Sequence, residues 1–146
     1  MIKRKIQLIT SSFGIRWNKL HKGIDLRSFT DDFKLRLPIV LPEDCEFVRR
    51  KYQKKWGFTL VFKPLKTAGY CEFKFTHVQD NDQLIPGQLY IKGQVITYTT
   101  TTDYMRKKKY GEHLHFETWR TAFKKLKRPV DPELYYEIRD IPKRRL

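Results

Sequence analysis

The four histidines of this chain lie in three short segments, RWNKLHKGIDLRS, FKFTHVQD and GEHLHFETW. In HKGID, His21 and Asp25 flank Gly23, which lets the backbone turn so that both side chains can face one ion. In HLH, His113 and His115 fall on the same side of a strand, because successive side chains of a strand alternate. Two imidazoles and a carboxylate are the protein ligands of a catalytic zinc ion that keeps its fourth position for water. A zinc hydrolase is therefore the first hypothesis.

Each of these pairs also fits a simpler explanation. A histidine and an aspartate four positions apart are more often a hydrogen-bonded surface pair than metal ligands. Glu117, on the same strand face as the paired histidines, fits either a partner that orients one imidazole or a plain glutamate at the sheet edge. The three tryptophans could line a groove, but we expect core packing for at least two of Trp17, Trp56 and Trp119.

The segments that position these residues read mainly as strands. Alternation in GYCEFKFTHV predicts a strand that points His77 to the same side as Phe73 and Phe75. Alternation in EHLHFETW predicts a strand whose opposite, core-facing side carries Leu114 and Phe116. The fold class that follows is mainly β, a single antiparallel β-sheet domain with little helix.

Further strands are predicted at 39–48, with a turn at 42–44, at 56–63, and at 88–100, with a possible bend at Gly93. Residues 80–88 read as a loop. The one plausible helix covers 117–128, and its first residues compete with the strand prediction for the same segment.

The composition limits the class of protein. With 146 residues, of which 40% are hydrophobic, the chain can build one compact core. We see no apolar run long enough to span a bilayer, and the apolar part near the N-terminus is too short for a secretory signal, so we expect neither membrane insertion nor a signal peptide. Cys45 and Cys71 form no CxxC pair and cannot make a disulfide framework, so we expect buried thiols.

The formal net charge of +15 comes from 31 Lys and Arg against 16 acids. The basic residues cluster at 49–55, 106–109, 124–128 and 143–145. Such charge favours a polyanionic partner, which could be nucleic acid, anionic lipid or a bacterial wall rich in phosphate and carboxylate. The charge alone does not choose among them.

The order of segments carries a resemblance to a known family. ITSSFGIRWNKLHKGIDL, followed later by GEHLHFE, resembles the LytM or lysostaphin-type zinc endopeptidases, whose motifs run HxGxD and GxHLHFE. LPIVLPEDCEFV, WGFTLVFK, YCEFKFTHV, PGQLYIKGQVI and RPVDPELYY are similar to further family segments in the same order. The resemblance implies a lysostaphin-like domain with a substrate groove at residues 1–136, followed by a basic C-terminal tail at 137–146.

The resemblance also implies the roles of five residues. His21, Asp25 and His115 match the family's ligands for one Zn²⁺ ion, and His77 and His113 match its two non-ligand catalytic histidines. One of these two would accept a proton from the attacking water, and the other would hydrogen-bond the charge that develops on the carbonyl. Which does which stays open. The substrate implied is the peptide part of bacterial peptidoglycan.

Two segments depart from the family, and one of them, LRSFTDDFKLRL between Asp25 and Pro38, is longer and more charged than usual. Ahead of HLH the family has a glycine-rich stretch, where this chain has TTTTDYMRKKKYGE and keeps only Gly111. This leaves the specificity open. A catalytically inactive structural protein is one alternative to the enzyme, and a nucleic-acid-binding protein, supported by charge alone, is another.

The expected location follows from a wall substrate without a signal peptide. We expect a bacteriophage protein carried in the virion tail, or else a free endolysin released to the host cell wall. Its partners would then be peptidoglycan peptides, neighbouring tail proteins, and anionic envelope polymers that meet the basic clusters.

Overall fold

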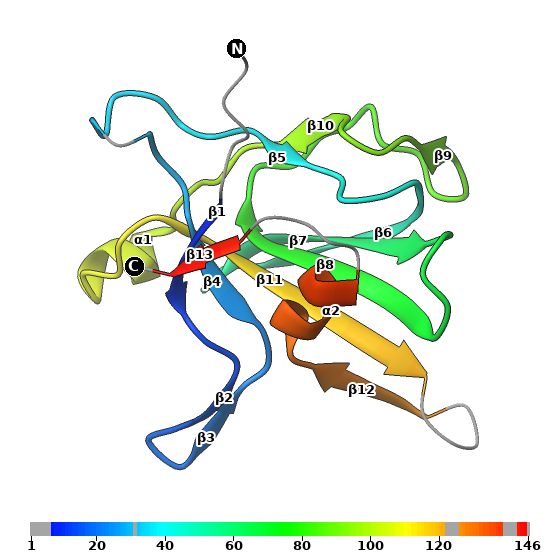
Figure 1. Ribbon diagram of the computed structural model, residues 1–146. Coiled ribbons are helices and arrows are strands. Elements are labelled where there is room, and N and C mark those ends of the chain that lie inside the picture. The colour runs from blue at the N-terminus through cyan, green and yellow to red at the C-terminus, as the bar shows by residue number, and fades with distance from the viewer. Residues whose placement is uncertain (1–6, 31, 122–125, 139–142, 146) are drawn as a thin grey trace.

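The computed structural model describes residues 7–30, 32–121, 126–138 and 143–145, and its fold is mainly β, as predicted (Figure 1). The described strands are β1 (Gln7–Ser11), β2 (Gly14–Arg16), β3 (Lys19–His21), β4 (Ile24–Arg27), β5 (Ile39–Val40), β6 (Cys45–Gln53), β7 (Gly57–Pro64), β8 (Tyr70–Val78), β9 (Leu89–Tyr90), β10 (Val95–Thr97), β11 (His113–Thr121), β12 (Lys127–Val130) and β13 (Lys143–Arg145). Two short helices complete the described fold, α1 (Asp103–Lys107) and α2 (Pro132–Ile138).

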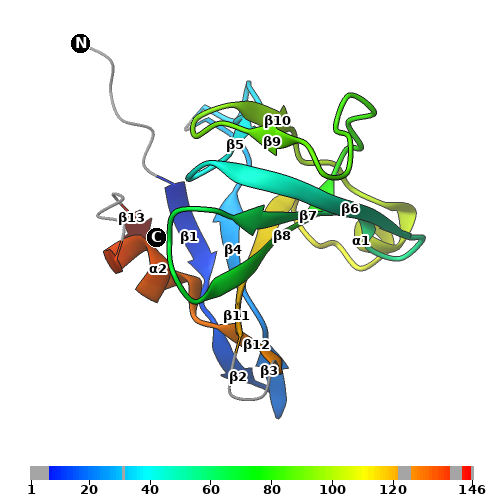
Figure 2. The ribbon, with the colours of Figure 1, turned by 90° about the vertical axis from the view of Figure 1, so that its right-hand side faces the viewer.

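One large sheet organises the molecule. Its strand order is β13-β1-β4-β11-β8-β7-β6-β9, with β12 paired to β11 beside this path. The described pairs are antiparallel except β1 with β13, which is parallel. The β2–β3 hairpin projects from the sheet beyond β1 and β4, and both views of the ribbon show it (Figures 1 and 2). The predicted antiparallel sheet is therefore confirmed.

One face of the sheet carries the core. Phe73 of β8 and Phe116 of β11 are fully buried, with ring centroids 5.6 Å apart in an edge-on arrangement. Tyr135 of α2 packs on Phe73 at 4.9 Å and donates its hydroxyl to the buried carboxylate of Glu43 at 2.8 Å. Edge-to-face aromatic pairs stabilise a core beyond the area that they bury. The apolar side of β11, with Leu114, faces this core as the alternation predicted.

The predicted helix at 117–128 is wrong wherever the structure describes it. Residues 117–121 continue β11, and 127–128 belong to β12, while 122–125 lie outside the described residues. Pairing explains the outcome, because β11 has β8 on one side and β12 on the other, so its backbone groups are bonded in ladders. Neither α1 nor α2, of five and seven residues, was predicted.

The predicted strand at 88–100 is broken in two. β9 and β10 flank a turn in which Gly93 has a φ of 82°, so the expected bend at this glycine is present. The segment 39–48 forms β5 and β6 around the predicted turn at 42–44, and β6 continues five residues further, to Gln53. The segment 56–63 forms β7 with small changes of boundary, and residues 80–88 form the predicted loop. The Cys45 thiol is buried as expected, whereas Cys71 is half-buried.

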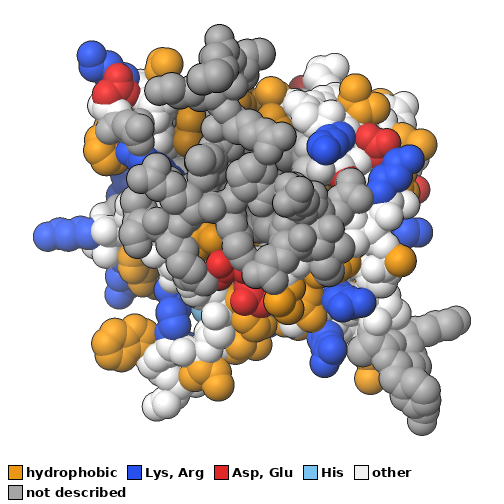
Figure 3. All heavy atoms as spheres, in the orientation of Figure 1, with side chains coloured by type: hydrophobic (Ala, Val, Ile, Leu, Met, Phe, Trp, Pro, Cys, Tyr) orange, Lys and Arg blue, Asp and Glu red, His pale blue; other side chains and the backbone are white. Residues whose placement is uncertain are grey.

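The predicted boundary between domain and tail stays a prediction. It falls after residue 136, inside α2, and β13 in the predicted tail pairs with β1 in the sheet. Neither described helix is long and apolar enough to cross a membrane. On the face shown in Figure 3, the visible Lys and Arg side chains lie around the periphery.

Candidate functional site

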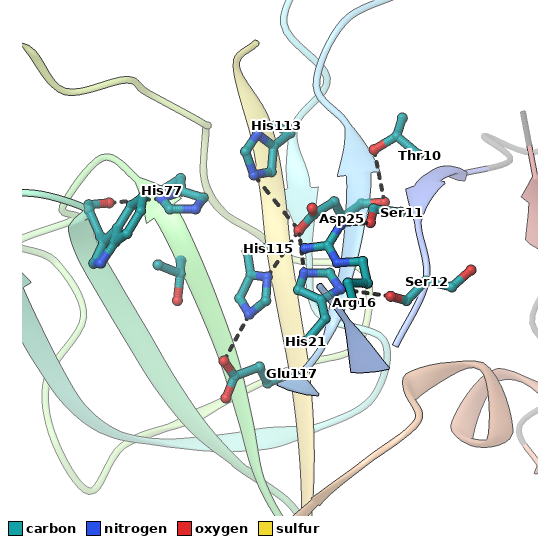
Figure 4. A network of polar contacts seen from close by, with 12 residues as sticks. Thr10, Ser11, Ser12, Arg16, His21, Asp25, His77, His113, His115 and Glu117 are labelled. Atoms are coloured by element: carbon teal, nitrogen blue, oxygen red, sulfur yellow. Dashed lines mark hydrogen bonds and ion pairs between the residues drawn. The ribbon is translucent and has the colours of Figure 1, made fainter. Parts of the chain in front are cut away.

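A groove of about 910 Å³ lies on the sheet, and all four histidines line it. Its floor consists of residues from β4, β11, β8, β7 and β6, and the β2–β3 hairpin and the segment before β11 add to its rim. Figure 4 shows the polar side chains at one end of the groove, where β3, β4 and β11 meet. The predicted substrate groove is thus present, and the five predicted site residues are brought together in it.

The three predicted metal ligands converge on one point. His21 Nε2 lies 3.2 Å from Asp25 Oδ1, and His115 Nδ1 lies 3.0 Å from the same oxygen (Figure 4). One ligand atom from each residue lies within 4.8 Å of the others. Register explains the closeness of two of them, because His115 on β11 pairs directly with Asp25 on β4.

Gly23 explains how His21 joins them. A Cβ atom at this position would lie 2.3 Å from the carbonyl oxygen of Phe116, closer than real contacts allow. A side chain here would therefore push the segment between His21 and Asp25 away from β11.

The ligand types and the two separations around Asp25 fit a zinc ion. Zinc bonds to histidine nitrogen and carboxylate oxygen are about 2.0–2.2 Å long, so neighbouring ligands of a tetrahedral ion lie about 3.3 Å apart. The distances from Asp25 Oδ1 to His21 Nε2 and to His115 Nδ1, 3.2 and 3.0 Å, are close to that ligand–ligand separation. Two imidazoles and one carboxylate also leave the fourth position for water or substrate.

Backbone carbonyls hold three of the histidines in one tautomer. A carbonyl only accepts, so His21 donates Nδ1–H to Ser12 at 2.7 Å, and His113 donates Nδ1–H to Gly111 at 2.7 Å. His77 likewise donates Nδ1–H to the carbonyl of Trp56 at 2.9 Å. In each neutral imidazole this leaves Nε2 as the lone-pair nitrogen, available to a metal or a proton.

The ring of His115 is held by two carboxylates, and its nitrogens have the opposite orientation to those of His21. Its Nδ1 faces Asp25, and its Nε2 lies 2.8 Å from Glu117 Oε2. The other oxygen of Glu117 accepts the indole N–H of Trp119 at 2.7 Å. A carboxylate behind a ligating histidine fixes the ring orientation and raises its basicity. Of the two readings of Glu117, the structure therefore favours the partner that orients an imidazole.

Charges at this end of the groove reinforce one another. Burial disfavours the charge on Asp25, but hydrogen bonds with His115 and His21 outweigh it and hold the pKa of this carboxyl well below its usual range. Burial also disfavours the charge on His115, and hydrogen bonds to Asp25 and Glu117 outweigh it and raise the pKa of His115 to about 9. Two carboxylates thus favour positive charge at the candidate metal position, whether a proton or a cation supplies it.

His77 does not point where the alternation predicted. It was expected on the side of Phe73 and Phe75, but it lines the groove beside Thr76. The reason is a β-bulge: the ladder with β7 shifts register at this point, and His77 has a φ of 68°. Burial lowers the pKa of His77 to about 4, which keeps the ring neutral. Its centroid lies 4.8 Å from that of His113.

The expectation that at least two tryptophans pack in the core is wrong, since all three line the groove. Trp17 stands at the tip of the β2–β3 hairpin with 96% of its surface exposed. Trp56 packs beside His77 at 5.7 Å, and Trp119 carries the ammonium of Lys74 over its ring at 4.2 Å. A groove rather than a core explains why Trp56 and Trp119 lie beside polar partners and Trp17 lies in solvent.

The segment TTTTDYMRKKKYGE packs beside the groove and contributes Tyr110 to its lining. Thr102 caps α1 by accepting from the Met105 N–H at 3.2 Å, and its hydroxyl donates to the Lys55 carbonyl at 2.7 Å. Tyr104 and Tyr110 then pack around Trp56, at 5.2 and 6.4 Å between ring centroids. Sequence reasoning singled this segment out as unusual but gave no role to Tyr110, which lines the groove.

The structure is similar to several solved structures. Over 91% of this chain, the structure is similar to the antimicrobial peptidase lysostaphin from Staphylococcus simulans, with a TM-score of 0.65 and 17% identity. The fold is lysostaphin-like. The chain spans about half of lysostaphin, since the match covers 50% of that protein. No family model and no curated protein matches the sequence.

Two further solved structures share the fold. One is a variant of the catalytic domain of the prophage-encoded M23 protein EnpA from Enterococcus faecalis, at a TM-score of 0.66 and 17% identity, covering 92% of this chain and 95% of that one. The other is a zinc-containing peptidase from Vibrio cholerae, at a TM-score of 0.57 and 24% identity, covering 89% of this chain and 37% of that one. At these identities the likeness establishes the fold alone.

Proposed function

We propose that this protein is a zinc-dependent endopeptidase that cleaves peptide bonds of bacterial peptidoglycan through a metal-activated water. The observation that carries the proposal is the convergence of His21, Asp25 and His115 within 4.8 Å, with His77 and His113 beside them in one groove. The names of the similar structures, a lysostaphin, a prophage-encoded M23 protein and a zinc-containing peptidase, support this reaction.

In this proposal His21, Asp25 and His115 hold the ion. Zinc bound there supplies a Lewis acid and lowers the pKa of a coordinated water to about 7. The remaining chemistry belongs to His77 and His113, whose Nε2 atoms are left for the groove by the Nδ1–H bonds to Trp56 and Gly111. One accepts the proton of the attacking water, and the other, once protonated, donates a hydrogen bond to the oxygen of the scissile carbonyl.

Zymography on purified cell wall tests the proposal. We expect clearing by the wild-type protein, loss of clearing with a chelator, and recovery on addition of zinc. A His115→Ala variant should not clear the wall, because a ligand is lost; clearing by this variant would overturn the ligand assignment. Absence of clearing by the zinc-loaded wild type would instead favour an inactive structural protein or a nucleic-acid-binding protein.

We further propose that the protein is carried in a phage virion tail, where it would open the wall for genome entry beside neighbouring tail proteins. One of the similar structures, matched over 95% of its length, is prophage-encoded, and a phage origin is our extension of that likeness in fold. The net charge of +15 supports retention on anionic envelope polymers. Mass spectrometry of purified particles tests the location: presence supports the tail, and absence together with lytic activity in host lysates supports a free endolysin.

A further inference from the structure

Two rows of side chains cross the floor of the groove at right angles to the strands. Direct pairing between β11, β8, β7 and β6 defines the first row as His115, Thr76, Thr59 and Lys51. The same pairings define the second row as Glu117, Lys74, Val61 and Arg49. All eight residues line the groove. The candidate metal site and Lys51 therefore lie at opposite ends of one row.

The length of this row can be expressed as a number of residues of an extended peptide bound along it. Neighbouring strands lie about 4.8 Å apart, so three steps from β11 to β6 separate His115 from Lys51 by about 14 Å. An extended peptide advances about 3.3–3.6 Å per residue. A peptide lying along the row would thus reach Lys51 about four residues from the bond at the metal site.

The middle of the row is small and neutral. The hydroxyls of Thr59 and Thr76 are hydrogen-bonded to each other at 3.0 Å, and Val61 beside them is 2% exposed. The Thr59, Thr76 and Val61 side chains carry no charge and are small enough to leave space for an extended chain.

The charges along the floor are mainly positive. Lys51 is exposed, and no carboxylate of the described residues lies within ion-pair distance of it. Lys74 sits over the Trp119 ring in the second row, and Arg49 bonds Glu72 at 3.0 Å. The one carboxylate in these two rows, that of Glu117, is already hydrogen-bonded to His115 and Trp119. An ammonium without a carboxylate partner at the end of the first row favours an anionic group.

We propose that the groove selects peptides that carry a free carboxylate about four residues from the scissile bond, and that Lys51 binds this carboxylate. The inference rests on the proposed peptidase function, and it makes an acidic peptide, rather than a neutral one such as oligoglycine, the preferred substrate class. Lys51 acts as a specificity-determining residue, and Lys74 adds positive charge between it and the metal site.

Binding and cleavage are measured separately on the same probes. The probes are fluorescently labelled peptidoglycan stem peptides, native or with their carboxylates converted to amides. Binding is measured by anisotropy with the metal-free protein, and cleavage with the zinc-loaded protein. Lys51→Gln is compared with Lys54→Gln, which removes the same charge three positions away, from an exposed turn residue outside the groove.

We expect Lys51→Gln to weaken binding of the native peptides about tenfold and Lys54→Gln less than twofold. Amidation should weaken wild-type binding by a similar factor and leave Lys51→Gln unaffected, because the pair is then already broken. Equal effects of the two lysine variants, or amidated peptides bound as well as native ones, would overturn the inference. Charge-dependent binding without cleavage of any peptide would contradict the peptidase proposal and leave the carboxylate site standing.

Discussion

Thr76 and His77 are consecutive residues of β8, yet both side chains line the same groove. In a regular strand they would point to opposite faces. Here Thr59 pairs with Thr76 and Phe58 pairs with Val78, so His77 is the extra residue of a bulge, in a left-handed conformation with a φ of 68°. Bulges re-aim side chains in this way beside active sites. The irregularity brings the His77 ring to His113.

A His77→Asn variant tests the role of this ring. Asn tolerates positive φ better than most residues, so the bulge should persist and the melting temperature should change little. Removal of a group that transfers a proton or donates to the carbonyl oxygen should lower kcat about 100-fold or more. The check is the rate of cleavage of labelled wall peptides alongside the thermal melt; an unchanged kcat in a folded variant would exclude a catalytic role for His77.

The parts of the site that local rules govern could be predicted from the sequence. His113 and His115 share a face because β11 is regular, and the HKGID spacing predicted that His21 and Asp25 meet, although Gly23 acts there through its close approach to β11 and not as a turn residue. The bulge at His77 depends on pairing with β7, which local alternation does not encode. The same holds for Lys51, whose place in line with His115 follows from three successive registers.

Tertiary pairing also explains the errors in the fold. Residues 117–128 suit a helix by composition, but β8 and β12 bond the described part of this segment as strand. Core packing was expected for at least two of the three tryptophans because large aromatic residues are mostly buried, and only the projecting β2–β3 hairpin reveals the exposure of Trp17. Long-range pairing overrides local preference in the first case, and a short projecting hairpin places the ring in solvent in the second.

Zinc should stabilise the protein through the three converging ligands. At a free zinc concentration about 100 times the Kd, binding contributes about 2.7 kcal/mol, which for a domain of this size raises Tm by roughly 5–10 °C. His115→Ala should abolish most of this shift. His113→Ala is the matched control from the same strand face, since it should lose activity but keep the zinc-dependent shift. Differential scanning fluorimetry with and without zinc measures both, and a lost shift in His113→Ala would place that residue among the ligands.

Glu117→Gln should weaken zinc binding without removing a ligand. Glu117 accepts at 2.8 Å from His115 Nε2, and loss of its charge makes the ligand less basic. Partners of this kind typically contribute 10–100-fold in metal affinity, which competition with a chromophoric chelator measures. Trp119→Phe, which removes only the 2.7 Å donor to the far oxygen of Glu117, should have a smaller effect. Wild-type zinc affinity in Glu117→Gln would show that the contact has no influence on the metal.

The buried carboxylate of Glu43 should make stability depend on acid pH. Burial disfavours its charge, but hydrogen bonds from the Thr67 side chain, the Lys66 and Thr67 N–H groups and the Tyr135 hydroxyl outweigh it and lower the pKa of Glu43 below its ordinary value of 4.5. Because the folded pKa lies below the unfolded one, this stabilisation is present above about pH 4.5 and is lost as the pH falls through the folded pKa.

Glu43→Gln should therefore destabilise the fold by about 1–3 kcal/mol at pH 7, since a Gln side chain satisfies fewer of these buried donors. The gap in unfolding free energy between this variant and the wild type should narrow as the pH falls from 5 toward 3, as urea melts at several pH values would show. Asp82→Asn, at an exposed loop carboxylate, provides the control and should leave the pH profile of stability unchanged. A constant gap over this pH range would mean that Glu43 contributes through packing and not through its charge.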